Sequence, residues 1–230
     1  MCLHFKKSET LSLESFRKMD LLAVTKFKLP IELMMENAGL QLAKLIAQYA
    51  ATNKDALILI GVGNGNNGGG GLVAARRLAA WGFKVFLDIA TEITKELPKI
   101  QLERALLFGV KINSIIDPDI WVDAYLGFSQ RLPLNSVYMK KIEMANTSSA
   151  LRISLDIPTG ISSSLSNPMF KAHKVVTLAA PKNLLNNLPI ETDIYIADLG
   201  IPKEVYTAFN IPMPAFFENQ LICINKKQYR

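Results

Sequence analysis

The chain has 230 residues, half of them hydrophobic, which is enough to bury a full core in a single domain over residues 1–230. Its formal charge of +6 comes from dispersed lysines and arginines, which indicates a solvated surface and makes nucleic-acid binding a minor hypothesis. Cys2 and Cys223 lie near opposite ends of the sequence without metal-ligand spacing, which indicates a reducing, cytoplasmic setting. Charged side chains interrupt residues 1–20, so neither a signal sequence nor a membrane span is expected there.

Two helices are predicted before the first strand. Ser12 is a suitable N-cap for the first, which directs Phe16 and Met19 toward a core. Pro30 suits the first turn of the second, in which apolar residues recur at helical spacing as far as Tyr49. Gly39 lies inside this second helix, where it costs stability, and we therefore expect another element to approach it closely.

A glycine-rich run follows the first predicted strand. Residues 56–60 form a short apolar run typical of a strand that is buried on both faces. Residues 61–71 hold seven of the 13 glycines and are predicted to form one loop, before a helix over residues 72–81 that Gly82 ends. Glycine permits positive φ and the close approach of a ligand, and the helix start favours an anion, so a phosphate is the expected guest.

The remaining elements alternate between strands and helices. Strands are predicted over residues 84–90, 110–116, 119–126, 151–156, 175–178 and 194–197, the second of these being the weakest, and helices over residues 97–108 and about 134–146. This alternation predicts an α/β fold, a three-layer Rossmann-like doubly wound domain whose mostly parallel sheet carries helices on both faces.

Three polar segments follow strands of this sheet. In open parallel sheets, ligands bind outside the carboxyl ends of the strands, where the strand order reverses. The glycine run, the loop after Asp123 and the turn that begins at Asp156 all occupy such ends. We therefore predict one pocket lined by residues 65–70, 127–133 and 156–160.

The glycine run has competing interpretations. Residues 63–68 match the dinucleotide fingerprint G-x-G-x-x-G, and Asp88 stands where a ribose-binding acid is often found, which is consistent with a dehydrogenase. A lone match is weak, and no histidine or lysine constellation of a dehydrogenase is visible. The run also lacks the lysine ending of a P-loop, which disfavours nucleoside triphosphate hydrolysis.

Five motifs in order resemble those of the NAD(P)H-hydrate epimerase family, whose domain is of the YjeF N-terminal type. They cover about residues 19–202 and comprise Met35–Gly39, Gly65–Arg76, Val122–Gly127, Leu155–Gly160 and Ala197–Pro202. The resemblance implies an isomerase that interconverts the R and S forms of hydrated NADH or NADPH, so that a dehydratase specific for one form can restore the cofactor. A dehydratase on a separate chain and a homodimer through the N-terminal helices are the partners that we expect.

The resemblance also assigns roles to individual residues. It places dinucleotide contacts on Asn66, Asn67, Gly68, Gly69, Gly70, Gly127, Phe128, Ser129, Gln130, Arg131, Leu132, Pro133 and Asp156. It places a potassium ion (K+) on Asn67, Asp123 and Thr159, where Thr159 replaces the family's usual serine but still offers a hydroxyl oxygen. Asp156 is the expected catalytic residue, because a carboxylate at this sheet edge can move a proton at the hydrated ring.

Each role has a structural alternative. Asn67 would also serve to satisfy backbone groups of a turn, and Asp123 to cap a neighbouring helix. Arg131 is suited to a pyrophosphate or a 2′-phosphate, but is equally consistent with exposed surface.

Gly70 departs from the family pattern, which has aspartate at this position. The missing carboxylate supports a second hypothesis, a catalytically impaired relative that acts as a dinucleotide-binding, RNA-binding or scaffold module. The retained Asp123 and Asp156 oppose it. We expect reduced activity rather than none.

Overall fold

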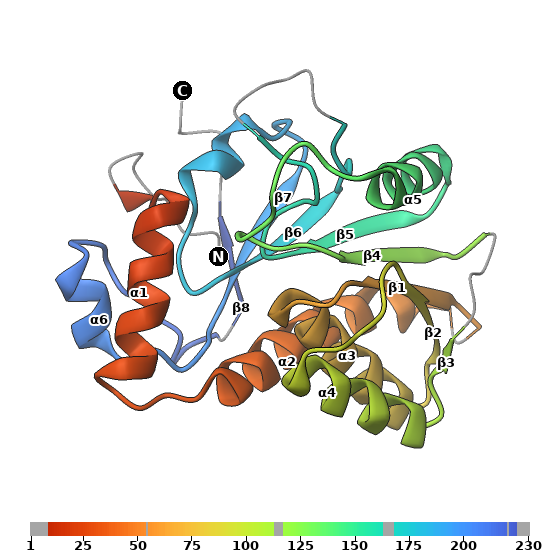
Figure 1. Ribbon diagram of the computed structural model, residues 1–230, viewed down its shortest axis with the longest axis horizontal. Helices are drawn as coiled ribbons and strands as arrows, with labels where there is room; N and C mark the ends of the chain where they lie inside the picture. The colour runs from red at the N-terminus through yellow and green to blue at the C-terminus, as the bar shows by residue number, and fades with distance from the viewer. Residues whose placement is uncertain (1–8, 54, 113–116, 163–167, 220, 225–230) are drawn as a thin grey trace.

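The computed structural model describes residues 9–53, 55–112, 117–162, 168–219 and 221–224, which form one layered α/β domain (Figure 1). Its helices are α1 (Leu13–Thr25), α2 (Ile31–Ala50), α3 (Asn66–Ala80), α4 (Glu96–Leu107), α5 (Ser136–Thr147), α6 (Lys203–Ala208) and the 3₁₀ helix η2 (Asn183–Asn187). Its strands are β1 (Leu57–Val62), β2 (Lys84–Ile89), β3 (Lys111–Ile112), β4 (Ile120–Ala124), β5 (Leu151–Leu155), β6 (Lys174–Leu178), β7 (Asp193–Ala197) and β8 (Leu221–Ile224).

The eight strands form one sheet in the order β3-β2-β1-β4-β5-β6-β7-β8. All neighbouring pairs are parallel except β7 and β8, which are antiparallel. The chain winds outward from β1 to β3 and then crosses back to β4, so strand order reverses between β1 and β4. Ligand sites of doubly wound sheets form at this reversal.

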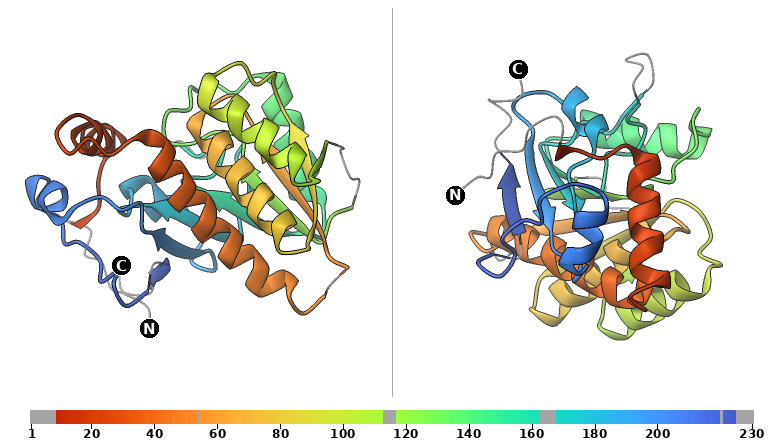
Figure 2. Two further views of the ribbon diagram at one scale, coloured as in Figure 1. Left: turned by 90° about the horizontal axis from the view of Figure 1, so that it is seen from below. Right: turned by 90° about the vertical axis from the view of Figure 1, so that its left-hand side faces the viewer.

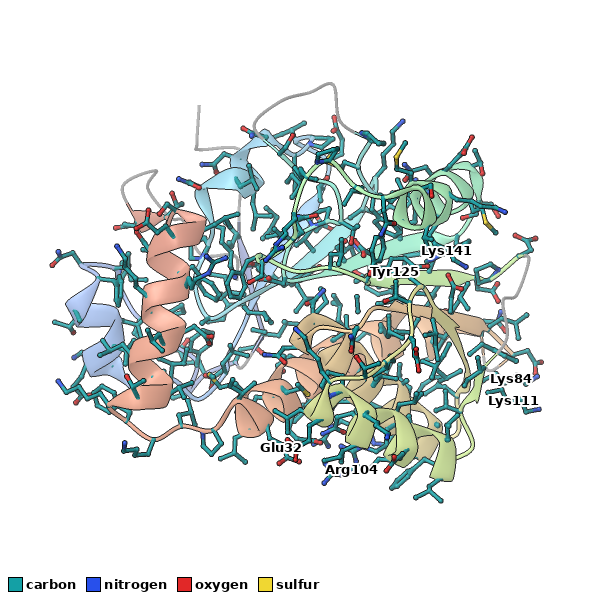
Figure 3. All side chains as sticks on the ribbon, in the orientation of Figure 1. Glu32, Lys84, Arg104, Lys111, Tyr125 and Lys141 are labelled. Carbon is teal, nitrogen blue, oxygen red and sulfur yellow. The ribbon has the colours of Figure 1, made fainter. Side chains whose placement is uncertain are left out.

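Helices cover both faces of the sheet, as predicted. α2, α3 and α4 lie side by side on one face, where they enclose a core with β1, β2 and β4 (Figures 1 and 2). A surface ion pair of 2.8 Å between Glu32 and Arg104 joins α2 to α4 (Figure 3). α5 covers the other face of the sheet. α1 and α6 pack beside each other at a distance from α5 (Figure 1). In the described residues, no helix is both long and apolar enough to cross a membrane.

Most of the predicted elements are confirmed. Ser12 caps α1 through its hydroxyl, which accepts from the Ser15 N–H at 3.0 Å. Gly39 is closely approached, since a Cβ there would lie 2.7 Å from the Gly70 carbonyl oxygen. Of the weak strand predicted over residues 110–116, only β3 is formed in the described part, and residues 113–116 lie outside the described residues. The sequence did not predict α6 or β8.

The glycine run is a correction, because residues 66–71 form the first turns of α3 instead of a loop. None of these glycines has positive φ. They are small because the helix lies very close to its neighbours: a Cβ on Gly69 would lie 2.6 Å from the Met35 sulfur, and one on Gly71 would lie 2.6 Å from the Ala124 Cβ. Tertiary packing here overrides the low helix propensity of glycine.

The N-terminal segment is anchored to the segment that follows β6. Leu11 forms a parallel bridge with Lys182, in which the Leu11 N–H donates to the Pro181 carbonyl at 2.9 Å and its own carbonyl accepts from Asn183 at 2.9 Å. Because α1 begins two residues later, this bridge fixes α1 against the segment that follows β6.

Candidate active site

A pocket of about 440 Å³ opens at the carboxyl edge of the sheet, at the reversal between β1 and β4. This volume is within the range of small-molecule sites. Its walls come from α1, α2, the first turn of α3, the loop after β4 and the end of β5. Of the three predicted segments, the pocket includes residues 65–67, Gly70, residues 127–130 and Asp156.

The first turn of α3 faces this pocket with the properties of an anion site. Its leading backbone N–H groups have no partners within the helix and lie at the positive end of the helix dipole. Asn66 and Asn67 belong to this turn, and Lys95 lines the same pocket with an exposed side chain. Backbone N–H groups beside a lysine are suited to the phosphates of a dinucleotide.

Asp156 follows β5 in a left-handed conformation, with φ of 69°. Such a conformation is strained for a residue other than glycine, although aspartate and asparagine tolerate it best. The backbone N–H of Asp156 donates to the Val176 carbonyl at 2.7 Å, which holds the turn against β6. The carboxylate therefore turns into the pocket, and Oδ2 accepts a hydrogen bond of 2.7 Å from the Phe128 N–H.

Lys182 lies under the pocket and is fully buried. Its Nζ forms a 2.8 Å ion pair with Asp156 Oδ1 and donates to the Leu178 carbonyl at 2.9 Å and the Thr177 hydroxyl at 3.1 Å. It also lies 3.7 Å from the centroid of the Phe16 ring. Burial lowers the pKa of Lys182, and the charge of Asp156 opposes this shift. The two residues form a buried acid–base pair at the pocket floor.

The loop after β4 is held by the turn at residues 156–160. Gln130 joins the two, because its Oε1 accepts from the Gly160 N–H at 2.7 Å and its Nε2 donates to the Pro158 carbonyl at 3.3 Å. Phe128 packs edge-on against Phe16 of α1, with ring centroids 5.1 Å apart. Arg131, Leu132 and Pro133 are exposed and lie outside the pocket lining.

Asp123 is a fully buried carboxylate at the end of β4. It accepts from the Ser154 hydroxyl at 2.5 Å, and from the Thr159 hydroxyl at 2.6 Å and N–H at 2.8 Å. Burial raises its pKa to about 6, although these hydrogen bonds lower it. In the described part of the chain, Asp123 has no cationic partner. It therefore caps the turn of residues 156–160 instead of a helix.

Asn67 has a buried side-chain oxygen that a cation could bind. Its Nδ2 donates to the Leu155 carbonyl at 3.3 Å, whereas its buried Oδ1 has no hydrogen-bond partner among the described residues. A buried acceptor without a donor is costly, and a cation would satisfy it. With one uncompensated carboxylate on Asp123 and the hydroxyl of Thr159, the three residues fit a single monovalent cation such as potassium.

The dehydrogenase interpretation fails at Asp88. This residue is buried and does not face a ribose site: Tyr125 donates to its Oδ2 at 2.6 Å and Lys141 pairs with its Oδ1 at 2.5 Å. Figure 3 labels Tyr125 at the sheet and Lys141 near α5. The Tyr125 ring also lies against Gly61, so closely that a Cβ there would overlap it.

The sequence is similar to known proteins over most of its length. The family described as YjeF-related protein N-terminus matches residues 31–184. The chain belongs to this family. An NAD(P)H-hydrate epimerase of Rhodopirellula baltica is 34% identical over 86% of this chain and 87% of that protein. A bifunctional NAD(P)H-hydrate repair enzyme of Thermofilum pendens is 31% identical, and the match covers 84% of this chain and 42% of that protein.

A crystal structure of the yeast protein ynu0 has the same fold. It superposes with a TM-score of 0.85 over 93% of this chain and 98% of that chain, at 21% sequence identity. The predicted fold class is thus confirmed both by the sheet order and by this neighbour.

All five motifs singled out in the sequence meet at the pocket. Each contributes at least one lining residue: Met35, Asn67, Tyr125, Asp156 and Leu199. The last motif is also bonded to the first, since Asn37 Nδ2 donates to the Leu199 carbonyl at 3.1 Å. Gly68 and Gly69 do not line the pocket: a Cβ on Gly68 would overlap the Gly63 carbonyl oxygen, and Gly69 packs against Met35.

Sequence reasoning missed three charged residues of this site, Asp20, Lys95 and Lys182. Lys182 follows β6 at the same sheet edge as Asp156, so the rule that selected Asp156 also selects Lys182. Asp20 lies one helical turn after Phe16 on α1, at the border of its buried face, and gives no comparable signal.

Proposed function

We propose that this chain is an NAD(P)H-hydrate epimerase, an isomerase that interconverts the R and S forms of hydrated NADH and NADPH. The observation that carries the proposal is the strained Asp156, held by Lys182 and Phe128 in a pocket to which all five family motifs contribute. The names of the relatives that match most of the chain support the same activity.

The phosphates of the substrate are proposed to lie at the first turn of α3, near Lys95, with Asn66, Asn67 and Gly70 beside them. The loop at residues 127–130 then covers the rest of the dinucleotide. Gln130 is proposed to hold this loop against the turn at residues 156–160, because its amide oxygen and amide nitrogen are both hydrogen-bonded to that turn. The nicotinamide end lies at Asp156.

Asp156 is proposed to transfer the proton that epimerisation requires at the hydrated ring. Lys182 fixes one of its oxygens and the Phe128 N–H fixes the other, so the carboxylate is oriented before the substrate binds. Positioned acid or base groups contribute roughly 10²–10⁴-fold to such reactions.

A potassium ion is proposed to be held by Asn67, Asp123 and Thr159. When bound, it supplies a fixed positive charge next to the buried Asp123 carboxylate. Because Thr159 belongs to the same turn as Asp156, these residues keep that turn in place.

The partners of this activity remain proposals. A dehydratase on a separate chain fits the relatives that this chain matches over nearly their whole length, such as the R. baltica epimerase. The relative in Thermofilum pendens is named as bifunctional. A homodimer through the N-terminal helices and a cytoplasmic location stay predictions.

Mixing the purified chain with both epimers of hydrated NADH and a dehydratase specific for one of them tests the activity. We expect both epimers to be consumed completely, because the epimerase feeds the second into the form that the dehydratase accepts. With the dehydratase alone, consumption of hydrated NADH should stop when the accepted epimer, about half of the total, has been used, apart from slow uncatalysed interconversion. Equal plateaus with and without this chain would refute the proposal and favour the scaffold hypothesis.

Potassium is expected to raise the melting temperature of the chain at constant ionic strength, compared with tetramethylammonium. A ligand at 100 times its Kd stabilises by about 2.7 kcal/mol. Asn67→Ala should lose this potassium response, because it removes the unpartnered Oδ1. Asn187→Ala, on the exposed η2, is the matched control and should keep it. A response that survives in Asn67→Ala would place the cation elsewhere.

Gly70→Asp is expected to fold and to match or exceed the activity of the parent. Gly70 has helical backbone and lines the pocket, so an added side chain enters the site without strain from positive φ. Its Cβ would lie 3.0 Å from Leu155 Cδ2, which requires a small shift of that side chain. Gly70→Ala carries the same steric change without a carboxylate and is the control. A Gly70→Asp variant less active than Gly70→Ala would contradict this prediction.

A further inference from the structure

Asp20 and Asp156 are the two carboxyl groups among the described residues that line the pocket. They differ in how they are held. Both oxygens of Asp156 are engaged and the residue is 1% exposed. The Asp20 side chain is half-buried and makes no hydrogen bond or ion pair within the described part of the chain. A ligand can therefore bind the Asp20 carboxyl without displacing a partner from the described residues.

Asp20 reaches the pocket from a different wall. It belongs to α1, whereas Asp156 follows β5 and Lys182 follows β6. The bridge between Leu11 and Lys182 fixes the start of α1, and Phe16, one turn before Asp20, packs under Lys182 Nζ and against Phe128. Asp20 is thus placed on a rigid element beside the Asp156–Lys182 pair.

The electrostatic setting of Asp20 suits a proton donor. Burial in the pocket raises its pKa; the positive charge of Lys182 opposes this shift, and the negative charge of Asp156 adds to it. These three groups interact, yet Lys182 is committed to Asp156 by a direct ion pair.

We propose that Asp20 is a second catalytic residue of the epimerisation, which donates a proton to the ring hydroxyl of the substrate from the α1 wall. The proposal rests on the epimerase function given above. Water adds to the dihydronicotinamide enamine with its oxygen on the carbon next to the ring nitrogen, because the nitrogen lone pair stabilises positive charge there. Inverting that carbon by hydroxyl exchange therefore requires an acid for departure and a base for return.

Asp20 gives its proton to the hydroxyl, the C–O bond breaks with its electron pair on oxygen, and water leaves as the nitrogen lone pair forms a C=N bond. Water then adds to the opposite face, the C=N pair returns to nitrogen, and the Asp156 carboxylate takes the released proton. After product release, exchange with solvent returns a proton to Asp20 and removes one from Asp156.

Asp20→Asn tests this role in the full-length chain, since it keeps the size of the side chain but cannot donate an acidic proton. We expect kcat for epimer interconversion to fall at least about 100-fold while KM changes less than about threefold. Glu14→Gln on the exposed side of the same helix is the control and should leave both constants unchanged. Thermal melting establishes that each variant is folded.

Asp20→Ala provides a second readout that a structural role would not produce. Because Asp20 lines an open pocket, added formate should restore turnover at least about tenfold in this variant and should have no effect on the parent. A folded Asp20→Asn with kcat within threefold of the parent, or an Asp20→Ala without rescue whose loss lies in KM, overturns the proposal for Asp20 alone. A parent that does not epimerise overturns the proposed function itself.

Discussion

Lys182→Met is expected to lower the free energy of unfolding by about 3–5 kcal/mol, because it leaves the Asp156 carboxylate buried without its charged partner. Methionine fills a similar volume and keeps the contact with Phe16, so the loss reports the broken ion pair rather than a cavity. Urea unfolding of the parent and the variant at neutral pH measures this difference in the free energy of unfolding.

The double variant separates the ion pair from packing. Asp156→Asn in the Lys182→Met background removes the stranded charge, and we expect it to recover about 1–3 kcal/mol of the loss. Lys84→Met breaks only an exposed pair with Asp55 and should leave the unfolding midpoint nearly unchanged. Single and double variants whose losses simply add would show that Asp156 and Lys182 are not coupled.

Asp156→Asn alone is expected to reduce epimer interconversion by about 10²–10⁴-fold while the protein remains folded. Asparagine tolerates the left-handed backbone at this position and its side-chain oxygen can still accept from the Phe128 N–H. The amide cannot take the proton that the reaction releases. Turnover is measured with excess dehydratase, with melting temperature as the check on folding.

Asp55→Asn is the matched control for this variant, since Asp55 lies on the surface away from the pocket. It should retain the activity of the parent. An Asp156→Asn protein with activity within tenfold of the parent would show that Asp156 positions the loop and is not the proton carrier.

The strands were predictable because their apolar runs are short and continuous, as in β1 and β4, which are buried on both faces. The edge where Asp123 and Asp156 lie followed from parallel topology alone. What the sequence could not predict is the start of α3. Local propensity disfavours four consecutive glycines in a helix, and the close tertiary neighbours of α3, such as Met35 and Ala124, account for them.

The sequence also could not predict which side chains become partners in the folded protein. Asp88 has the position expected of a ribose-binding acid, but Tyr125, distant in sequence, takes one of its oxygens and Lys141 the other. Asp20 gave no signal because a single carboxylate on an amphipathic helix is most often solvated. Its place in the pocket depends on where α1 docks, which is a property of the complete fold.

The bridge between Leu11 and Lys182 has a consequence for the order in which the protein matures on the ribosome. Neighbouring strands such as β1 and β2 can pair once the short segment containing them has emerged, whereas this bridge joins the start of the described sequence to the segment that follows β6. Contacts of such long sequence separation cannot form until both partners have been synthesised. A nascent chain that ends before Lys182 therefore has neither the floor of the pocket nor the anchor for the α1 wall, and we expect enzymatic competence only after the segment that follows β6 has emerged.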